Sequence, residues 1–166
     1  NMTAVKINDD VIIFDAGIYL PAIVEIQEQE RYLKPSEKEL RRIGALHDDL
    51  ILDKLGWREK VRAIIIGHAH LDHVGALPYI AHRYPNAEII ATPFTMNILD
   101  SISHDENIVI NNPRKIVRED STYFIKGKSR DYKAEFIYTP HSTIQCVFVA
   151  LHTPEGIFFY ALDFKF

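Results

Sequence analysis

The chain has 166 residues, of which 47% are hydrophobic and 25% charged; these values fit one folded domain and exclude intrinsic disorder or coiled coil as its main state. The net charge of −4 gives no strongly basic footprint for nucleic acid, and the longest apolar runs are too short to cross a bilayer. A single cysteine, Cys146, excludes an internal disulfide and a cysteine-cluster metal site; with no signal peptide in view, we expect a cytoplasmic protein.

The first half of the chain alternates between strand and helix patterns. Ser36 and Glu39 have capping-box spacing, which predicts the start of a short, solvated surface helix. The β-branched apolar run 61–66 is typical of a strand buried on both faces. Thr92 and Pro93 are a typical N-cap and first-turn proline. We therefore expect strands over 5–7, 11–14, 61–66 and 88–91, and helices from near Ser36, over 74–83 and from Pro93 to about Ser103.

The second half of the chain consists mostly of strand-like segments separated by turn residues. There is no internal repeat and no linker that would divide the chain into two domains. The order of elements predicts an α/β (α+β) fold with layered sheets and helices outside. We expect these later strands over 108–110, 115–117, 122–125, 134–138, 145–151 and 157–160.

A dense cluster of metal-binding side chains follows the buried strand at 61–66. His68, His70, Asp72 and His73 lie within six residues. In an extended segment His68 and His70 point the same way, whereas Asp72 and His73 turn to another face as a helix starts. One segment can therefore supply two ligands to each of two metal ions, and its donors suit zinc, manganese or iron. The alternative is a polar loop that caps the next helix, but a cap needs only one such group.

Three single residues at strand ends are candidates for the rest of the site. His141 and Asp163 each follow a predicted strand and could complete the metal ligands. Asp15 also ends a strand, and it is either an acceptor that orients a ligand histidine or a simple turn aspartate. We interpret the remaining histidines as ordinary surface or hydrogen-bonded residues: His47, His82, His104 and His152.

The cluster at 68–73 matches the His-x-His-x-Asp-His signature of the metallo-β-lactamase superfamily. With its wider context, the chain resembles the ribonuclease J family of the β-CASP branch, particularly its archaeal type. This resemblance implies an αββα sandwich, with a metal pair at one edge of the two sheets. The segments that carry it are Asn1-Met2-Thr3, 14–17 (FDAG), 67–78 (GHAHLDHVGALP), 140–142 (PHS), 152–156 (HTPEG) and 163–165 (DFK).

The resemblance also implies a role for each site residue. The first metal would be held by His68, His70 and His141, the second by Asp72 and His73, with Asp163 bridging both and Asp15 in support. Two positions depart from the family pattern. Leu162 stands where glycine is usual, and Gly67 stands where threonine is common.

Members of this family continue beyond the residue that matches Asp163 into a β-CASP domain and then return to the lactamase-like fold. The resemblance therefore implies that residues 1–166 are the first part of a metallo-β-lactamase-like domain. The later parts would supply the last ligand of the second metal, the general acid and most of an RNA channel. The full-length parent could also form a homo-oligomer.

The implied activity is metal-dependent hydrolysis of RNA, by a 5′-to-3′ exonuclease, an endonuclease or both. Two divalent metals, zinc or alternatively manganese, would activate a shared water for attack on phosphorus. They would also supply local positive charge that the net charge of the residues does not include. Asp72, His73 and Asp163 are the candidate catalytic residues. Two alternatives remain at this point: a related hydrolase acting on a thioester, lactone or lactam, and a metal-binding module without turnover.

Overall fold

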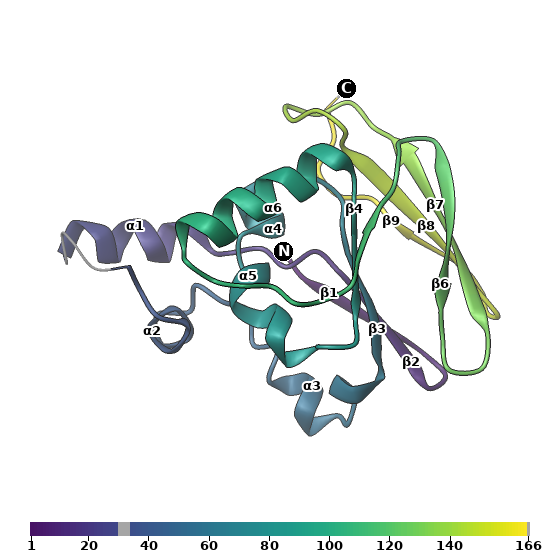
Figure 1. Ribbon diagram of the computed structural model, residues 1–166, viewed down its shortest axis with the longest axis horizontal. Helices are drawn as coiled ribbons and strands as arrows, with labels where there is room; N and C mark the ends of the chain where they lie inside the picture. Colours follow the sequence, from purple (N-terminus) through teal and green to yellow (C-terminus); the bar gives the residue numbers. More distant parts are fainter. Residues whose placement is uncertain (30–33, 166) are drawn as a thin grey trace.

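The computed structural model describes residues 1–29 and 34–165 as three layers: helices, a five-stranded sheet and a four-stranded sheet (Figure 1). In the first sheet, the strands lie in chain order. The first pair is antiparallel and the other pairs are parallel. These strands are β1 (Thr3–Ile7), β2 (Asp10–Phe14), β3 (Val61–Ile66), β4 (Glu88–Ala91) and β5 (Arg114–Ile116).

The second sheet is antiparallel throughout and also follows chain order. The sequence correctly predicted a strand for each of its members, but the strand expected over 108–110 is wrong. That run follows the last helix without pairing, with Ile108 and Ile110 packed against the core and Val109 exposed. The strands are β6 (Ser121–Lys126), β7 (Asp131–Tyr138), β8 (Val147–Thr153) and β9 (Gly156–Tyr160).

Helices cover the first sheet on the face away from the second (Figure 1). The capping box is confirmed: Ser36 Oγ accepts a hydrogen bond from Glu39 N, and the Glu39 carboxylate accepts one from Ser36 N. The α-helices are α1 (Leu20–Gln29), α2 (Glu37–Arg42), α3 (Ile51–Lys54), α4 (Leu71–Val74), α5 (Leu77–Ile80) and α6 (Pro93–Asp105), and the 3₁₀ turns are η1 (Arg58–Lys60) and η2 (Ala81–Arg83).

The continuous helix predicted over 74–83 is instead three short pieces. The helical path begins earlier, at Leu71, and α4 ends before Gly75. Pro78 lies in the first turn of α5, where its missing N–H costs no helical hydrogen bond. The proline is therefore accommodated by a fresh helix start.

Two apolar clusters fill the spaces between the layers. In β3, Ile64 and Ile66 pack under the helices, whereas Ala63 and Ile65 pack against the second sheet. β2 divides in the same way, because successive side chains of a strand point to opposite faces. Burial on both faces holds the ends of β2 and β3 rigidly, and the candidate site lies at these ends.

The outer face of the second sheet carries exposed apolar side chains, including Phe124, Ile157 and Phe159. Within the described ranges, no helix lies against this face (Figure 1). The chain thus forms the first three layers of the αββα arrangement that the sequence led us to expect. Among its described helices, none combines the length and apolar character needed to cross a membrane.

Candidate metal centre

The segment after β3 changes direction at His70, and this separates its metal-binding side chains into two groups. His70 has extended backbone angles, φ −68° and ψ 144°, and α4 begins at the next residue. His68 is fully buried in the extended part, whereas Asp72 and His73 lie in α4, which is a single turn. The predicted division into two faces is therefore present in the backbone.

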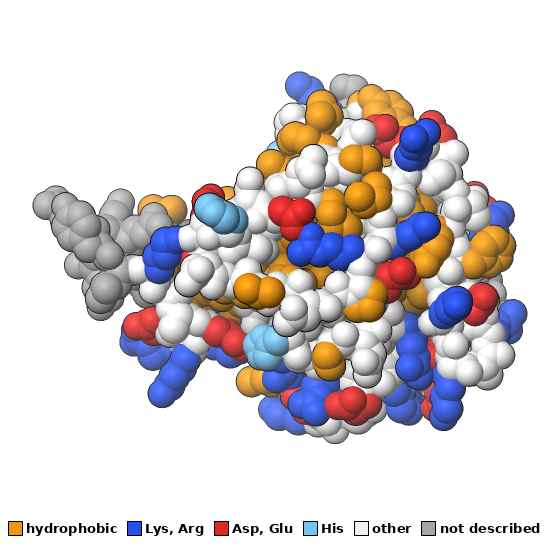
Figure 2. All heavy atoms as spheres, viewed as in Figure 1, with side chains coloured by type: hydrophobic (Ala, Val, Ile, Leu, Met, Phe, Trp, Pro, Cys, Tyr) orange, Lys and Arg blue, Asp and Glu red, His pale blue; other side chains and the backbone are white. Residues whose placement is uncertain are grey.

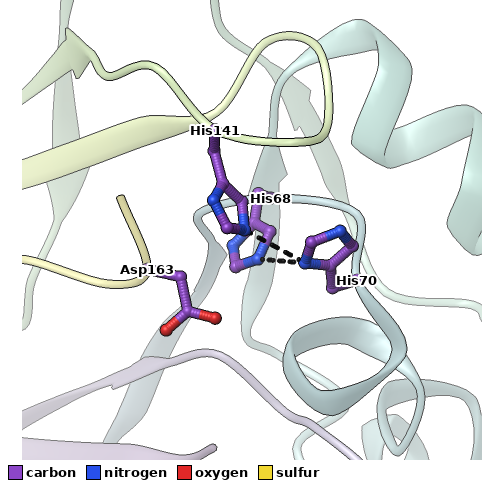
Figure 3. Close-up of side chains that lie close together, drawn as sticks. All are labelled: His68, His70, His141 and Asp163. Atoms are coloured by element: carbon purple, nitrogen blue, oxygen red, sulfur yellow. Dashed lines mark hydrogen bonds between the residues drawn. The ribbon is translucent and has the colours of Figure 1, made fainter. Parts of the chain in front are cut away.

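Three imidazoles converge on one point, together with the carboxylate of Asp163 (Figure 3). His70 Nδ1 lies 3.1 Å from His68 Nε2 and 3.2 Å from His141 Nε2. One ligand atom from each of these residues and from Asp163 lies within 4.8 Å of the others. The structure thus brings together residues from the ends of β3, β7 and β9, and we call these four residues the first ligand set.

The electrostatics of His68 and His70 favour neutral imidazoles. Burial lowers the pKa of His68 to about 3, with a further contribution from the neighbouring histidines. Burial, followed by the charge of His141, also lowers the pKa of His70. The outward nitrogen of His70, Nε2, lies 3.1 Å from Ser142 Oγ. The ring nitrogens that face one another are hydrogen-bonded in this structure, and a neutral imidazole nitrogen is also the group that binds a metal ion.

A second group of side chains lies beside the first and shares Asp163 with it. His73 Nε2 is 3.4 Å from Asp72 Oδ2 and 3.4 Å from Asp163 Oδ2. These three residues, which we call the second ligand set, could hold another ion. His73 is buried, whereas the side chains of Asp72 and Asp163 are 44% and 54% exposed, so solvent reaches the centre from the carboxylate side.

Asp15 supports the second ligand set from behind. Its Oδ2 accepts a hydrogen bond from His73 Nδ1 at 2.7 Å, and its Oδ1 accepts one from Gly67 N at 2.9 Å. Burial lowers the pKa of His73, but the hydrogen bond to Asp15 and the surrounding carboxylate charges outweigh this and leave the pKa above its ordinary value. With Nδ1 used in this way, Nε2 faces the ligand set.

The turn that carries Asp15 is tied directly to α4. Ala16 N donates to His73 O, and Ile18 N donates to Leu71 O. Gly17 fits between them because a Cβ there would lie 1.6 Å from the backbone oxygen of Asp72. The sequence motifs 14–17 and 67–78 are therefore two sides of one packed contact.

Asn1 contacts the second ligand set, a role that reasoning from residue types did not find. Its Nδ2 donates to Asp72 Oδ2 at 3.0 Å and lies 3.0 Å from His73 Nε2. The only signal in the sequence was its place in the first segment of the family resemblance. The carboxamide holds the Asp72 carboxylate beside His73.

The two departures from the family pattern lie against each other. A Cβ at Gly67 would lie 1.8 Å from Leu162 Cδ2, so the leucine side chain fills the space that a side chain at position 67 would take. The segment that carries Asp163 is also fixed by Lys165 N, which donates to Pro140 O at 2.9 Å. The glycine at position 67 thus leaves room for the Leu162 side chain.

The loop that carries His141 is anchored to α6 by Gln145. Its Oε1 accepts a hydrogen bond from Phe94 N at 2.8 Å, and its backbone oxygen accepts one from Thr92 Oγ1 at 3.0 Å. Thr92 is the N-cap residue as predicted, but its side chain makes no capping bond. The cap comes instead from the distant loop, which links α6 to the first ligand set.

The donor types fit divalent metals. Three imidazole nitrogens and one carboxylate suit zinc, manganese or iron, and the more oxygen-rich second set suits the same group of ions. The remaining histidines lie outside both sets. Of these, His152 Nε2 contacts Glu135 Oε1 at 2.8 Å and His47 Nε2 lies 2.9 Å from the backbone nitrogen of Asn1.

Comparisons with curated proteins connect this geometry to known sequences. The chain is 39% identical over its whole length to ribonuclease J of Pyrococcus abyssi and 35% identical to ribonuclease J of Methanocaldococcus jannaschii. It covers 35% and 36% of those two proteins. The chain therefore spans about a third of the length of the curated relatives it matches.

Solved structures show the same fold at low sequence identity. A protein of unknown function from Enterococcus faecalis aligns with 99% of the chain and 40% of its own length, with a TM-score of 0.65 and 20% identity. The flavodiiron protein of Giardia intestinalis aligns with 92% of the chain and 30% of its own length, with a TM-score of 0.57 and 18% identity. The family model for the metallo-beta-lactamase superfamily matches residues 1–153, and the chain belongs to that superfamily.

Proposed function

We propose that this chain is the metal-binding portion of a ribonuclease that hydrolyses RNA phosphodiester bonds. The observation that carries the proposal is the pair of ligand sets that share Asp163 at the edge of the two sheets. The names of the two archaeal relatives, both ribonuclease J, supply the substrate class. Because the chain covers about a third of each, the activity is proposed for a protein that also contains the counterpart of the rest, including a β-CASP domain.

The residues of the chain would have distinct roles in this reaction. His68, His70, His141 and Asp163 would hold one divalent ion, zinc or manganese, and Asp72, His73 and Asp163 would hold another. Bound ions would supply a water of lowered pKa and positive charge toward phosphate oxygens. Asp15 and Asn1 keep His73 and Asp72 in place.

The exposure of the ligands sets the direction from which a substrate arrives. His68 and His73 are buried, whereas the carboxylates of Asp72 and Asp163 are about half exposed. A phosphate group would therefore approach past the carboxylates. The scissile bond of a bound RNA would then lie next to the exposed carboxylates of Asp72 and Asp163 and to any ions that they hold.

The surface of the chain offers little general attraction for a polyanion. The net charge is −4, and on the face seen in Figure 2 basic side chains are interspersed with acidic ones. Phosphate contacts to Lys and Arg supply most of the affinity of proteins that bind nucleic acid. We propose that these contacts come from regions outside residues 1–166, so the chain alone should show little or no ribonuclease activity.

A chimera tests the proposed function. The 166 residues would replace the matching segment of P. abyssi ribonuclease J, and the chimera and the chain alone would be assayed on 5′-monophosphorylated RNA and on a generic thioester, with zinc or manganese. We expect the chimera to cleave RNA, to lose this activity with a chelator, and to lose it with Asp72→Ala.

Circular dichroism and thermal unfolding would establish that each chimera is folded. A folded chimera that hydrolyses the thioester but not RNA would contradict the nuclease function and favour the related hydrolase. A folded chimera with neither activity would contradict catalysis and favour a metal-binding module. Full RNA cleavage by the Asp72→Ala chimera would contradict the roles of the second ligand set.

A further inference from the structure

Tyr160, the last residue of β9, contacts the support of the second ligand set. Its hydroxyl donates to Asp15 Oδ2 at 2.8 Å. The same oxygen accepts the hydrogen bond from His73 Nδ1 at 2.7 Å, while the other oxygen accepts one from Gly67 N. The Asp15 carboxylate is therefore held by three donors from two segments of the chain, 67–78 and the end of β9.

The position of Tyr160 in the chain gives this bond a second consequence. Asp163, which belongs to both ligand sets, follows Tyr160 by three residues. The tyrosine ring packs on Phe14, the neighbour of Asp15, with ring centroids 5.0 Å apart. One hydroxyl thus links the strand that delivers Asp163 to the carboxylate that orients His73.

The environment keeps the hydroxyl in its donor form. Burial and the nearby charge of Asp15 raise the pKa of Tyr160 above its ordinary value. A partly buried bond to a carboxylate is stronger than a bond between neutral groups. The hydroxyl is therefore a fixed donor across the physiological range of pH.

We propose that Tyr160 is a positioning residue for the second ligand set. Its hydroxyl holds Asp15 and thereby fixes the orientation of His73 and the position of Asp163 beside it. The proposal rests on the second ligand set assigned under the proposed function. The same sheet offers a matched control in Tyr132, a buried residue of β7. Its hydroxyl donates to the carboxylate of Asp10 at 2.8 Å, and Asp10 belongs to neither ligand set.

The test compares Tyr160→Phe with Tyr132→Phe in the 166-residue chain. Both variants keep the ring and lose one hydrogen bond to a carboxylate. Zinc and manganese affinities would be measured by calorimetric titration, stability by urea unfolding, and the His73 ring by its ¹⁵N chemical shifts. We expect Tyr160→Phe to bind the ion of the second ligand set about tenfold less tightly, the scale of loss for groups that orient metal ligands. We also expect this variant to shift the His73 signals.

Tyr132→Phe should lower stability to a similar degree and leave both affinities and the His73 signals unchanged. The positioning role would be overturned if the two variants changed the affinity of the second ligand set equally, or if Tyr160→Phe did not change it. A His73→Ala variant separates this failure from that of the proposed function. If His73→Ala binds both ions as the wild type does, the second ligand set itself is wrong.

Discussion

Asp163 and His68 illustrate how single residues divide the work of the metal centre. His68 is fully buried, and its low pKa keeps the ring neutral and ready to accept a cation. Asp163 is about half exposed and belongs to both ligand sets. The buried histidine would fix the position of an ion, whereas the exposed carboxylate faces the solvent and would connect the two ions.

At the same scale, Asp15→Asn tests the support of His73. Asparagine tolerates the left-handed backbone of Asp15, φ 59°, so the turn should survive. Loss of the carboxylate should lower the metal affinity of the second ligand set by roughly 10–100-fold and leave that of the first ligand set nearly unchanged. Calorimetric zinc titration of the folded variant is the measurement, and equal weakening of both ions would count against a specific link to His73.

Among the elements, the contact between Gly67 and Leu162 allows a paired substitution. Gly67→Thr alone should destabilise the fold by about 1–3 kcal/mol, because the new Cβ would collide with the leucine side chain. Combining it with Leu162→Gly should recover much of this loss, since the leucine side chain is removed. Urea unfolding of the wild type, both single variants and the double variant measures the coupling, and purely additive effects would refute the compensation.

The cap that Gln145 provides for α6 gives another prediction at this scale. Gln145→Ala should remove the hydrogen bond to Phe94 N and lower the stability by about 1 kcal/mol. It should also lower the metal affinity of the first ligand set, because the loop that carries His141 is held less firmly. Ser36→Ala, which removes the cap of α2, is the control: it should lower stability similarly without changing metal affinity. Thermal unfolding and zinc titration report the two effects, and unchanged zinc affinity in Gln145→Ala would disprove the link to the loop.

Local patterns predicted those elements whose signals lie within a few residues. The run 61–66 and the capping box at Ser36 were predicted from neighbouring residues alone, and the structure confirms both. α1 and α3 were missed because one begins just before a charge-rich segment and the other is a single short turn. The helix expected over 74–83 is broken because α4 packs against the Asp15 turn and stops at Gly75.

The candidate site shows the same limit. His68, His70, Asp72 and His73 are neighbours in the sequence, so the spacing of their side chains is enough to indicate metal chemistry. The contributions of Asn1, Tyr160 and Gln145 depend on contacts between residues more than 50 positions apart in the chain. Such contacts leave no periodic or local signal, and only the packing of the layers creates them.

On the scale of the whole molecule, the layers bring distant segments to one edge. The first sheet supplies the ends of β2 and β3, and the second sheet supplies the segments after β7 and β9. The two sheets share the apolar cluster between them, so the ligand sets depend on how the sheets pack. The metal centre is therefore a product of the complete sandwich edge, and the two ligand sets differ in their number of donors.

Calorimetric zinc titration of the 166-residue chain tests this account most directly, with the wild type compared to His68→Ala/His70→Ala and to Asp72→Ala. The first ligand set has four residues and the second has three, and a site with fewer protein ligands binds more weakly. We expect two unequal binding events, loss of the tighter one in the double histidine variant, and loss of only the weaker one in Asp72→Ala. If the wild type and the double histidine variant bind equally little zinc, the metal centre described here is wrong.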